Sequence, residues 1–399
     1  MFGSTRSYEM ARRLVQMGHE VNLITTKRDG DSESTWRVTD EAGIKVHWIS
    51  IPYSNKMGFG ARLHAFFLFG FYAARKAASI SADTIFATST PLTIALPAIY
   101  AKWRQNIPMV LEVRDLWPEV PIAMGALRNP IMAFMAKCLE KFAYANSASI
   151  VALSPDMRVG VARTGYPEAR IHVIPNGADP ELFDAPGTLG DEFRELHGIS
   201  ADATLMVYAG TLGKVNGVSY LVKLAAAMLA DRRFFVLIIG DGSESHEVRL
   251  LAQSTGCLGQ NLIMIPPVPK NQVPQVLNAA DIVISTVIPI KALWANSANK
   301  IFDGMAAGCC IAINHGGWLA DLLRQKDAGL VLSPVAEEAA LQIKTLLDST
   351  HDLGRMKGNA RQLADSLFSR DALANQLESV LKKASDNSKD GSPQGRARN

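Results

Sequence analysis

At 399 residues the chain is too long for one ordinary hydrophobic core, so two domains are expected, and 48% hydrophobic with 20% charged residues is a globular composition. The formal net charge of +3 arises in the tail from Lys382 onward, which leaves the body near neutral and argues against a nucleic-acid partner. The four cysteines lack metal-site or disulfide spacing, and the first residues lack a secretory signal pattern, so a reduced, cytoplasmic setting without a metal is expected.

The first half of the chain alternates predicted helices and strands. Apolar residues repeat at helical spacing over 8–17, and the apolar run 21–26 predicts a strand directly afterwards. Further strands are predicted over 46–51, 84–87, 109–113, 149–153 and 171–174, with helices over 62–79, 91–104 and 131–145. Before the first helix, Gly3 and Ser4 are small residues of the kind that leave helix-start amides open to a phosphate.

One helical stretch of this half, 65–74, is apolar on all sides and flanked by basic residues. It is too short to span a bilayer, which takes about 20 residues. Two interpretations stay open, a helix lying in a membrane interface and a helix buried in the core.

After a polar passage over 176–190 the alternation of strands and helices restarts. Strands are predicted over 205–209, 234–239, 262–265, 282–285 and 310–313. Because strands that are apolar on both faces alternate with helices, each half is expected to be an α/β domain with a parallel, doubly wound sheet. The expected domains are 1–180 and 181–365, followed by a helix over 366–384 that returns toward the first domain and a disordered tail over 385–399.

Four segments of the second half follow predicted strands, where ligands of open α/β sheets bind. The segment 208–217 is a glycine-rich turn with a lysine, 240–242 is a short glycine turn, and 266–270 is a rigid proline loop. In the fourth segment, Lys300 and Asp303 are three residues apart on one helix face, suited to anionic oxygens and a ribose diol. Each segment alone also has a structural explanation, as a tight turn, a strand end or a Lys300–Asp303 ion pair.

Taken in order, these segments resemble the retaining glycosyltransferases of family 4, which have the GT-B fold of two Rossmann-like domains facing across a cleft. Residues 174–179 (IPNGAD), 240–242 (GDG) and 303–308 (DGMAAG) are similar to family motifs. Residues 112–119 (EVRDLWPE) resemble a subgroup that transfers N-acetylated amino-deoxy sugars, such as the L-fucosamine transferases. The family begins with a strand before the turn at Gly3, so the resemblance implies that the first strand is missing through a misassigned start or a truncation.

The resemblance implies a site for a UDP-sugar and an acceptor. Donor-diphosphate contacts are expected from Gly3, Ser4, Gly210, Thr211, Lys214 and Lys300. Nucleotide contacts are expected from Gly240, Asp241, Gly242, Val268 and Asp303, and donor-sugar contacts from Asn296, Ser297 and Asn299. Catalytic roles fall to Arg114, Asp115, Glu119 and Lys300, with the first three in the acceptor-binding domain.

The chain departs from the family pattern at several of these positions. Ala295 stands where the family has the first of two glutamates, and Asp303 replaces the second. Thr211 replaces a phosphate-binding arginine and Asn216 a lysine, and Arg114 stands where many members have histidine. Lys214 and Lys300 are therefore expected to bear the diphosphate contacts.

The implied reaction is transfer of an N-acetylated deoxy hexose, with retention, to an undecaprenyl-type lipid-linked or glycan acceptor in O-antigen or capsule-type synthesis. No cofactor is expected, and peripheral contact through 62–76 would place the protein at the inner face of the plasma membrane. Two alternatives stay open: a GT-B-like UDP-sugar 2-epimerase, and an inactive homologue that serves as a scaffold.

Overall fold

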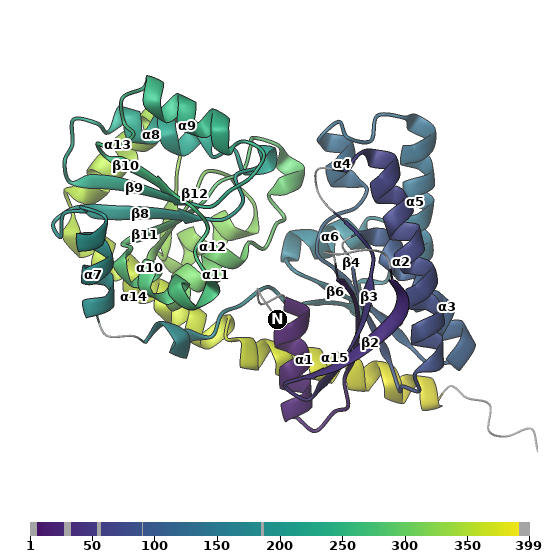
Figure 1. The fold of residues 1–399 in the computed structure, drawn as a ribbon. Coiled ribbons are helices and arrows are strands. Elements are labelled where there is room, and N and C mark those ends of the chain that lie inside the picture. The colour runs from purple at the N-terminus through teal and green to yellow at the C-terminus, as the bar shows by residue number, and fades with distance from the viewer. Residues whose placement is uncertain (1–5, 28–32, 54–56, 90, 185–186, 391–399) are drawn as a thin grey trace, which may run out of the picture. The chain divides into compact units, whose positions relative to one another are not determined.

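The computed structural model describes residues 6–27, 33–53, 57–89, 91–184 and 187–390. It divides into two compact units (Figure 1). Unit 1 comprises Met1–Pro175 and Leu373–Asn399, and unit 2 comprises Asn176–Ala372. Gly3 and Ser4 lie outside the described residues, so the prediction of a phosphate-binding turn there stays a prediction.

Unit 1 contains a four-stranded parallel sheet in the order β4-β5-β6-β7. Its strands are β4 (Ile85–Ser89), β5 (Met109–Val113), β6 (Ser149–Ala152) and β7 (Ile171–Val173). All five residues of β5 are buried, as expected for a central strand with apolar side chains on both faces.

A second sheet of unit 1 has the order β1-β3-β2. The strand β1 (Asn22–Lys27) runs parallel to β3 (Ile44–Ser50), whereas β2 (Glu33–Glu41) pairs with β3 in antiparallel fashion. Among the strands that the structure describes, unit 1 therefore has parallel pairs in both of its sheets, and β2 is the one strand added in antiparallel fashion. Within the described residues, β1 and β4 each pair with a single strand, and no residue of β1 is fully buried.

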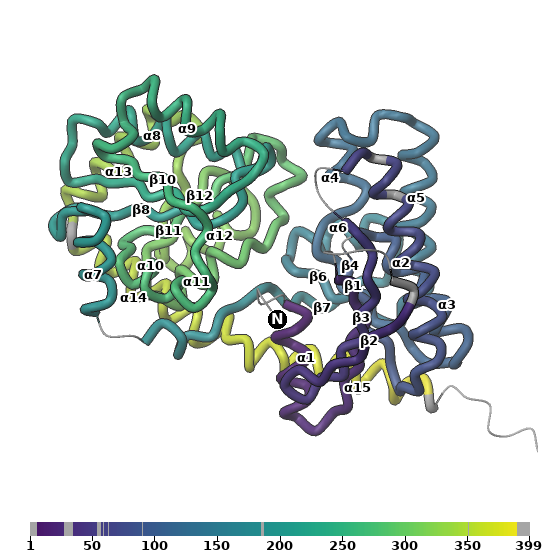
Figure 2. The backbone as a smooth tube through the Cα atoms, in the orientation of Figure 1, coloured from purple at the N-terminus to yellow at the C-terminus, as the bar shows by residue number. Residues whose placement is uncertain are grey.

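The helices of unit 1 cover both sheets. They are α1 (Arg6–Gln16), α2 (Phe59–Ser79), η1 (Leu92–Ile94), α3 (Ala95–Gln105), α4 (Glu119–Ala123), α5 (Pro130–Ala145), α6 (Pro155–Ala162), η2 (Glu168–Arg170) and most of α15 (Arg370–Asp390). Met10 and Leu14 of α1 and Leu377 of α15 share one apolar cluster with β5 and β6, and the tube in Figure 2 shows α15 running along this unit. The predicted disorder from residue 385 is wrong as far as Asp390, because the helix continues and buries Ser385.

The core-helix interpretation of the apolar stretch in α2 is also wrong for two of its rings. Phe67 and Phe71 are each 57% exposed. Among the described residues, no helix is long and apolar enough to cross a membrane.

A buried ion pair joins α1 to the four-stranded sheet. Arg6 Nε lies 2.6 Å from Glu112 Oε1, and both side chains are almost fully buried. The other carboxylate oxygen accepts from Thr88 Oγ1 at 2.8 Å, and Arg6 Nη2 donates to the Ile174 carbonyl at 2.8 Å. Glu112 is the only acidic residue in β5, and these partners satisfy its charge.

Unit 2 is a doubly wound domain with a six-stranded parallel sheet in the order β10-β9-β8-β11-β12-β13. Its strands are β8 (Thr204–Ala209), β9 (Phe234–Ile239), β10 (Leu262–Ile265), β11 (Ile282–Ser285), β12 (Cys310–Ile313) and β13 (Gly329–Val331). Its helices are η3 (Pro180–Phe183), α7 (Thr188–Leu196), η4 (Lys214–Asn216), α8 (Ser219–Ala227), α9 (Ser245–Ser254), η5 (Lys270–Gln272), α10 (Val273–Ala279), η6 (Lys291–Leu293), α11 (Asn299–Ala306), α12 (Trp318–Lys326), α13 (Ala336–Leu347) and α14 (Thr350–Leu367). Two apolar clusters, one on each face of the sheet, form the core.

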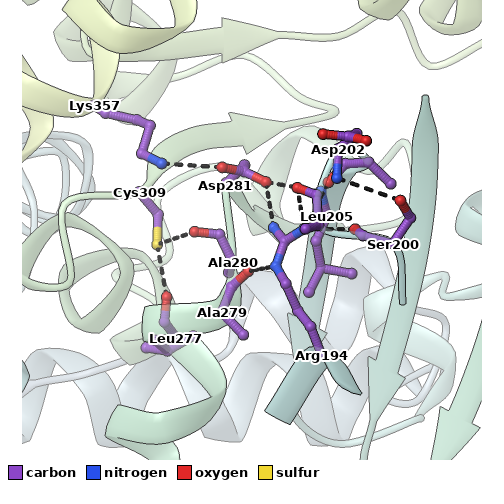
Figure 3. A network of polar contacts seen from close by, with 12 residues as sticks. Arg194, Ser200, Asp202, Leu205, Leu277, Ala279, Ala280, Asp281, Cys309 and Lys357 are labelled. Carbon is purple, nitrogen blue, oxygen red and sulfur yellow. Dashed lines mark hydrogen bonds and ion pairs between the residues drawn. The ribbon is translucent and has the colours of Figure 1, made fainter. Parts of the chain in front are cut away.

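A polar network closes the edge of this sheet where the strands begin (Figure 3). Asp281, just before β11, accepts from Arg194 at 2.6 Å, from Lys357 at 3.0 Å and from the Leu205 amide at 3.0 Å. Arg194 Nε also donates to the Ala279 carbonyl at 2.9 Å. This network ties α7 and α14 to the sheet, which leaves the opposite edge of the sheet to the loops described next.

Candidate functional site

The predicted site loops of unit 2 all leave the same edge of the sheet. They follow β8, β9, β10 and β11, and parallel strands end at one edge. The chain runs from β8 outward to β10 and then returns to β11 beside β8, so the order of strands reverses between these two. Ligands of doubly wound sheets bind at this switch point.

Two glycine turns at this edge interlock. The Gly210 amide donates to the Ile239 carbonyl at 2.9 Å, and the Leu212 amide donates to the Asp241 carbonyl at 3.0 Å. Gly240 has φ +150°, and a Cβ there would lie 1.8 Å from the Gly210 carbonyl oxygen. The glycine at 240 is therefore required by the close approach of the two turns, whether or not a nucleotide binds.

The carboxylate of Asp241 accepts two hydrogen bonds from within its own loop. Oδ1 accepts from the Gly242 amide and from Ser245 Oγ, both at 2.7 Å, which stabilises the turn into α9. Val268, in the proline loop after β10, packs partly against one of the apolar clusters. Contact of these residues with a nucleotide stays a prediction.

Lys300 lies at the switch point with its ammonium group enclosed. It occupies the first turn of α11, and its Nζ is 3.6 Å from the centroid of the Tyr208 ring. A Cβ on Gly210 would come within 2.8 Å of this nitrogen, so the lysine reaches the glycine turn after β8. Burial lowers the pKa of Lys300 to about 7. Within the described chain no carboxylate makes an ion pair with it, so the Lys300–Asp303 pair is wrong.

Asp303 faces a different cation. Arg370 Nη2 lies 3.5 Å from Asp303 Oδ1, and Arg370 Nη1 donates to Asp179 Oδ2 at 2.7 Å. The arginine therefore connects α11 to the segment 174–179 singled out in the sequence. Because Arg370 is distant in sequence and lies outside every motif, sequence reasoning missed it.

Of the three polar residues expected at the donor sugar, Ser297 is hydrogen-bonded to Asn176. Its hydroxyl accepts from the Asn176 amide at 3.1 Å, and its carbonyl accepts from the Asn176 side chain. Ser297 is buried beside Asn176, and its contact with a donor sugar stays a prediction. Asn296 and Asn299 are exposed, as the assignment requires.

The loop after β8 presents its remaining predicted residues outward. Thr211 is exposed, and its carbonyl accepts from Tyr208 Oη and from the Asn216 side chain, each at 2.8 Å. Lys214 is exposed at the start of η4. Their contact with a diphosphate stays a prediction.

The predicted residues of unit 1 gather after the central strand β5. The Arg114 amide donates to Ser89 Oγ at 3.4 Å, at the end of the neighbouring strand β4. Burial raises the pKa of Asp115 to about 6, against the lowering effect of Arg114. Glu119 is exposed at the start of α4 and, with burial, helps to raise the pKa of Glu140 to about 7. Sequence reasoning did not single out Glu140.

A further loop at the edge of unit 2 was also missed. Asn314 exchanges hydrogen bonds with the Val287 amide and carbonyl at 2.9 and 3.1 Å, which ties the loop after β12 to the loop after β11. His315 is buried beside it, and burial lowers its pKa. Gly317 follows with φ +89° and begins α12. The glycine pair directly after an apolar strand was the available signal.

Comparison with protein families matches the two halves of the chain separately. The family described as "Glycosyl transferase 4-like domain" matches residues 3–177. The family described as "Glycosyl transferases group 1" matches residues 190–363.

Curated relatives match over part of their length. EpsF of Bacillus subtilis is 31% identical over 123 residues, which are 30% of this chain and 32% of the relative. An Escherichia coli UDP-Gal:alpha-D-GlcNAc-diphosphoundecaprenol alpha-1,3-galactosyltransferase is 23% identical over 200 residues, 49% of this chain and 50% of the relative. The chain thus spans at most half the length of these two relatives.

Solved structures are similar over nearly the whole chain. HepE of Anabaena, in complex with UDP and glucose, has a TM-score of 0.67 at 19% identity and covers 86% of this chain and 87% of its own. At this identity the likeness establishes the fold, which is GT-B, as the sequence predicted.

Proposed function

Since the chain has the GT-B fold, with a glycosyl transferase 4-like half and a glycosyl transferases group 1 half, we propose that it is a retaining glycosyltransferase that uses a UDP-sugar. The observation that carries the proposal is Lys300, an enclosed lysine without a carboxylate partner in the described chain, placed at the switch point of the unit 2 sheet. A buried ammonium group is stabilised by a bound anion, and the diphosphate of a nucleotide sugar supplies one.

The difficult step of the transfer is departure of the anionic UDP while positive charge grows on the sugar. Lys300 stabilises the diphosphate as its charge develops, assisted by the amides of the turn at Gly210 and by Lys214. Because the site is already built around the cation, little reorganisation is needed when the bond breaks. The approach of a diphosphate raises the pKa of Lys300 from about 7, so the lysine is fully charged when the donor is bound.

The remaining donor contacts follow from the loops that surround Lys300. Asp303, oriented by Arg370, accepts from the ribose hydroxyls. The turn 240–242 and Val268 line the uridine, and the exposed side chains of Asn296 and Asn299 contact the transferred sugar.

The acceptor is assigned to unit 1. Asp115 is a half-buried carboxyl after β5, and burial raises its pKa to about 6. A carboxylate of this pKa orients an acceptor hydroxyl near neutral pH, and Arg114 and Glu119 support it from the same loop. The name of the Escherichia coli relative specifies a diphosphoundecaprenol-linked acceptor, and on this similarity we assign a lipid-linked acceptor at the inner face of the plasma membrane.

The sugar itself is assigned from the segment 112–119. It resembles the subgroup that transfers N-acetylated amino-deoxy hexoses, so we propose such a hexose as the donor sugar and surface polysaccharide synthesis as the context.

The test is a release assay for UDP across a panel of UDP-sugars, with and without an undecaprenyl-diphosphate-linked sugar. Transfer predicts acceptor-dependent release of UDP with one sugar, abolished in Lys300→Met and preserved in Lys326→Met, an exposed lysine of α12. An isomerised UDP-sugar without acceptor, detected by NMR, would instead identify a 2-epimerase. Absence of UDP binding by calorimetry would identify an inactive homologue.

A further inference from the structure

Six exposed aromatic rings gather on three neighbouring helices of unit 1. They are Phe67 and Phe71 of α2, Tyr100 and Trp103 of α3, and Phe134 and Phe142 of α5, and they are the only exposed aromatic rings among the described residues. In Figure 1 these helices lie side by side in unit 1, and contacts join α2 to α3 and α3 to α5. Exposed apolar surface on this scale marks an interaction site.

The apolar surface is continuous from helix to helix. The Trp103 and Phe142 rings meet edge to face at 6.1 Å between centroids, which joins α3 to α5. A groove of about 690 Å³ between α2 and α3 is lined by Phe67, Phe71 and Tyr100 on its walls.

The outer face of α5 extends the surface further. Ile131, Phe134, Met135, Cys138 and Phe142 are all exposed and repeat at the spacing of one helix face. An amphipathic helix normally turns such a stripe inward, whereas α5 presents it outward. We call the outward surfaces of α2, α3 and α5 together the aromatic face.

The charge of the three helices that form the aromatic face is mainly positive. They carry the basic residues Arg62, Arg75, Lys76, Lys102, Arg104, Lys137 and Lys141 and a single acidic residue, Glu140. Burial raises the pKa of Glu140 to about 7, which reduces its negative charge at neutral pH. Lys102, by contrast, donates a hydrogen bond to the Asn146 carbonyl within unit 1.

We propose that the aromatic face docks unit 1 on an anionic lipid bilayer. Aromatic rings and long apolar side chains that project among basic residues suit the boundary between phosphate headgroups and acyl chains. A second copy of the chain is a poor occupant, because two faces with the same positive charge repel. The inference goes beyond the donor site, and it assigns to α3 and α5 a role that sequence reasoning gave to α2 alone.

The experiment is co-sedimentation of the full chain with vesicles that contain no glycosyl acceptor. We expect binding to vesicles of phosphatidylglycerol and phosphatidylcholine, little binding to phosphatidylcholine alone, and loss of binding at high salt. Trp103→Ser with Phe134→Ser should weaken binding at least about tenfold, since each ring adds a large apolar area to the bilayer contact. Arg75→Gln with Lys137→Gln should weaken it by about tenfold or more.

The matched control is Leu196→Ser with Leu341→Ser, two side chains of unit 2 that are 78% and 64% exposed. It should bind vesicles as the parent does. The proposal is overturned if the parent binds neither kind of vesicle, if binding ignores lipid charge, or if the ring variant and the control behave alike. UDP affinity, measured by calorimetry without vesicles, reports separately on the donor site and on correct folding of unit 2.

Discussion

Replacing Lys300 by Met should stabilise the protein without ligand while destroying its donor site. Burial moves the pKa of this lysine from 10.5 to about 7, which corresponds to roughly 5 kcal/mol of unfavourable free energy for the charged form. The Tyr208 ring, 3.6 Å from Nζ, offsets up to about 2 kcal/mol of this. Methionine keeps the length of the side chain, so a net gain of about 3 kcal/mol is expected at pH 7.

The pH dependence of this gain has a defined sign. The unfolded chain binds a proton at this lysine below about pH 10.5, whereas the folded chain binds it only below about pH 7. Protonation of the unfolded state therefore lowers the stability of the parent as the pH falls from 10.5 to 7, and has no further effect below 7. The advantage of Lys300→Met should thus be largest at pH 7 and below, and smaller at about pH 9.

Calorimetric melting at these pH values, followed by titration with UDP, checks both parts. A gain of about 3 kcal/mol raises the Tm of a domain of this size by roughly 6–12 °C, while UDP affinity should fall at least about tenfold. Lys326→Met serves as the exposed control and should change neither. A melting temperature at or below that of the parent would refute the burial argument. A stabilised variant with unchanged UDP affinity would refute the diphosphate role.

Three other changes follow from the same contacts. In Gly240→Ala the added methyl group would lie 1.8 Å from the Gly210 carbonyl oxygen, so both UDP affinity and Tm should fall. An unchanged Tm would contradict the close packing of the two turns. Arg6→Met leaves buried Glu112 without its cation and should lower the free energy of unfolding in urea by about 3–5 kcal/mol. If Asp115 works as a carboxylate, kcat/KM should fall as the pH drops below about 6, and Asp115→Asn should remove that limb from the profile.

A structural feature could be predicted from the sequence when the residues that cause it are neighbours in the chain. The strands of unit 2 from β8 to β12 were predicted to within a residue, because each is a buried apolar run bounded by glycine, proline or aspartate. The strand β2 was not predicted because Glu33–Glu41 is largely polar and pairs only at a sheet edge. The strand β13 was not predicted because Gly329–Val331 is short. Neither has the buried run that was the signal elsewhere.

The residues of the candidate site were likewise predictable only where their partners are close in sequence. Lys300 was singled out by its position at a helix start and by its neighbours in sequence, and its contact with a diphosphate stays a prediction. The roles of Ser297 and Arg370 are set by Asn176 and Asp179, partners more than a hundred residues away. Nothing in the polar run 296–299 indicates that Ser297, rather than a neighbour, pairs with the segment 174–179.

The path of α15 has a consequence for how the protein is made. Leu373, Leu377 and Leu381 complete the apolar cluster beneath β5 and β6, so unit 1 is assembled from two segments that flank unit 2 in sequence, whereas unit 2 is a single continuous segment. On the ribosome, residues 176–372 are therefore the first to possess all the parts of their fold, although they are synthesised second. Unit 1 must wait, with α1 and the central strands uncovered, until the segment from Leu373 to Ala384 has been synthesised after unit 2. The half of the chain made first is thus the half that depends longest on protection from aggregation.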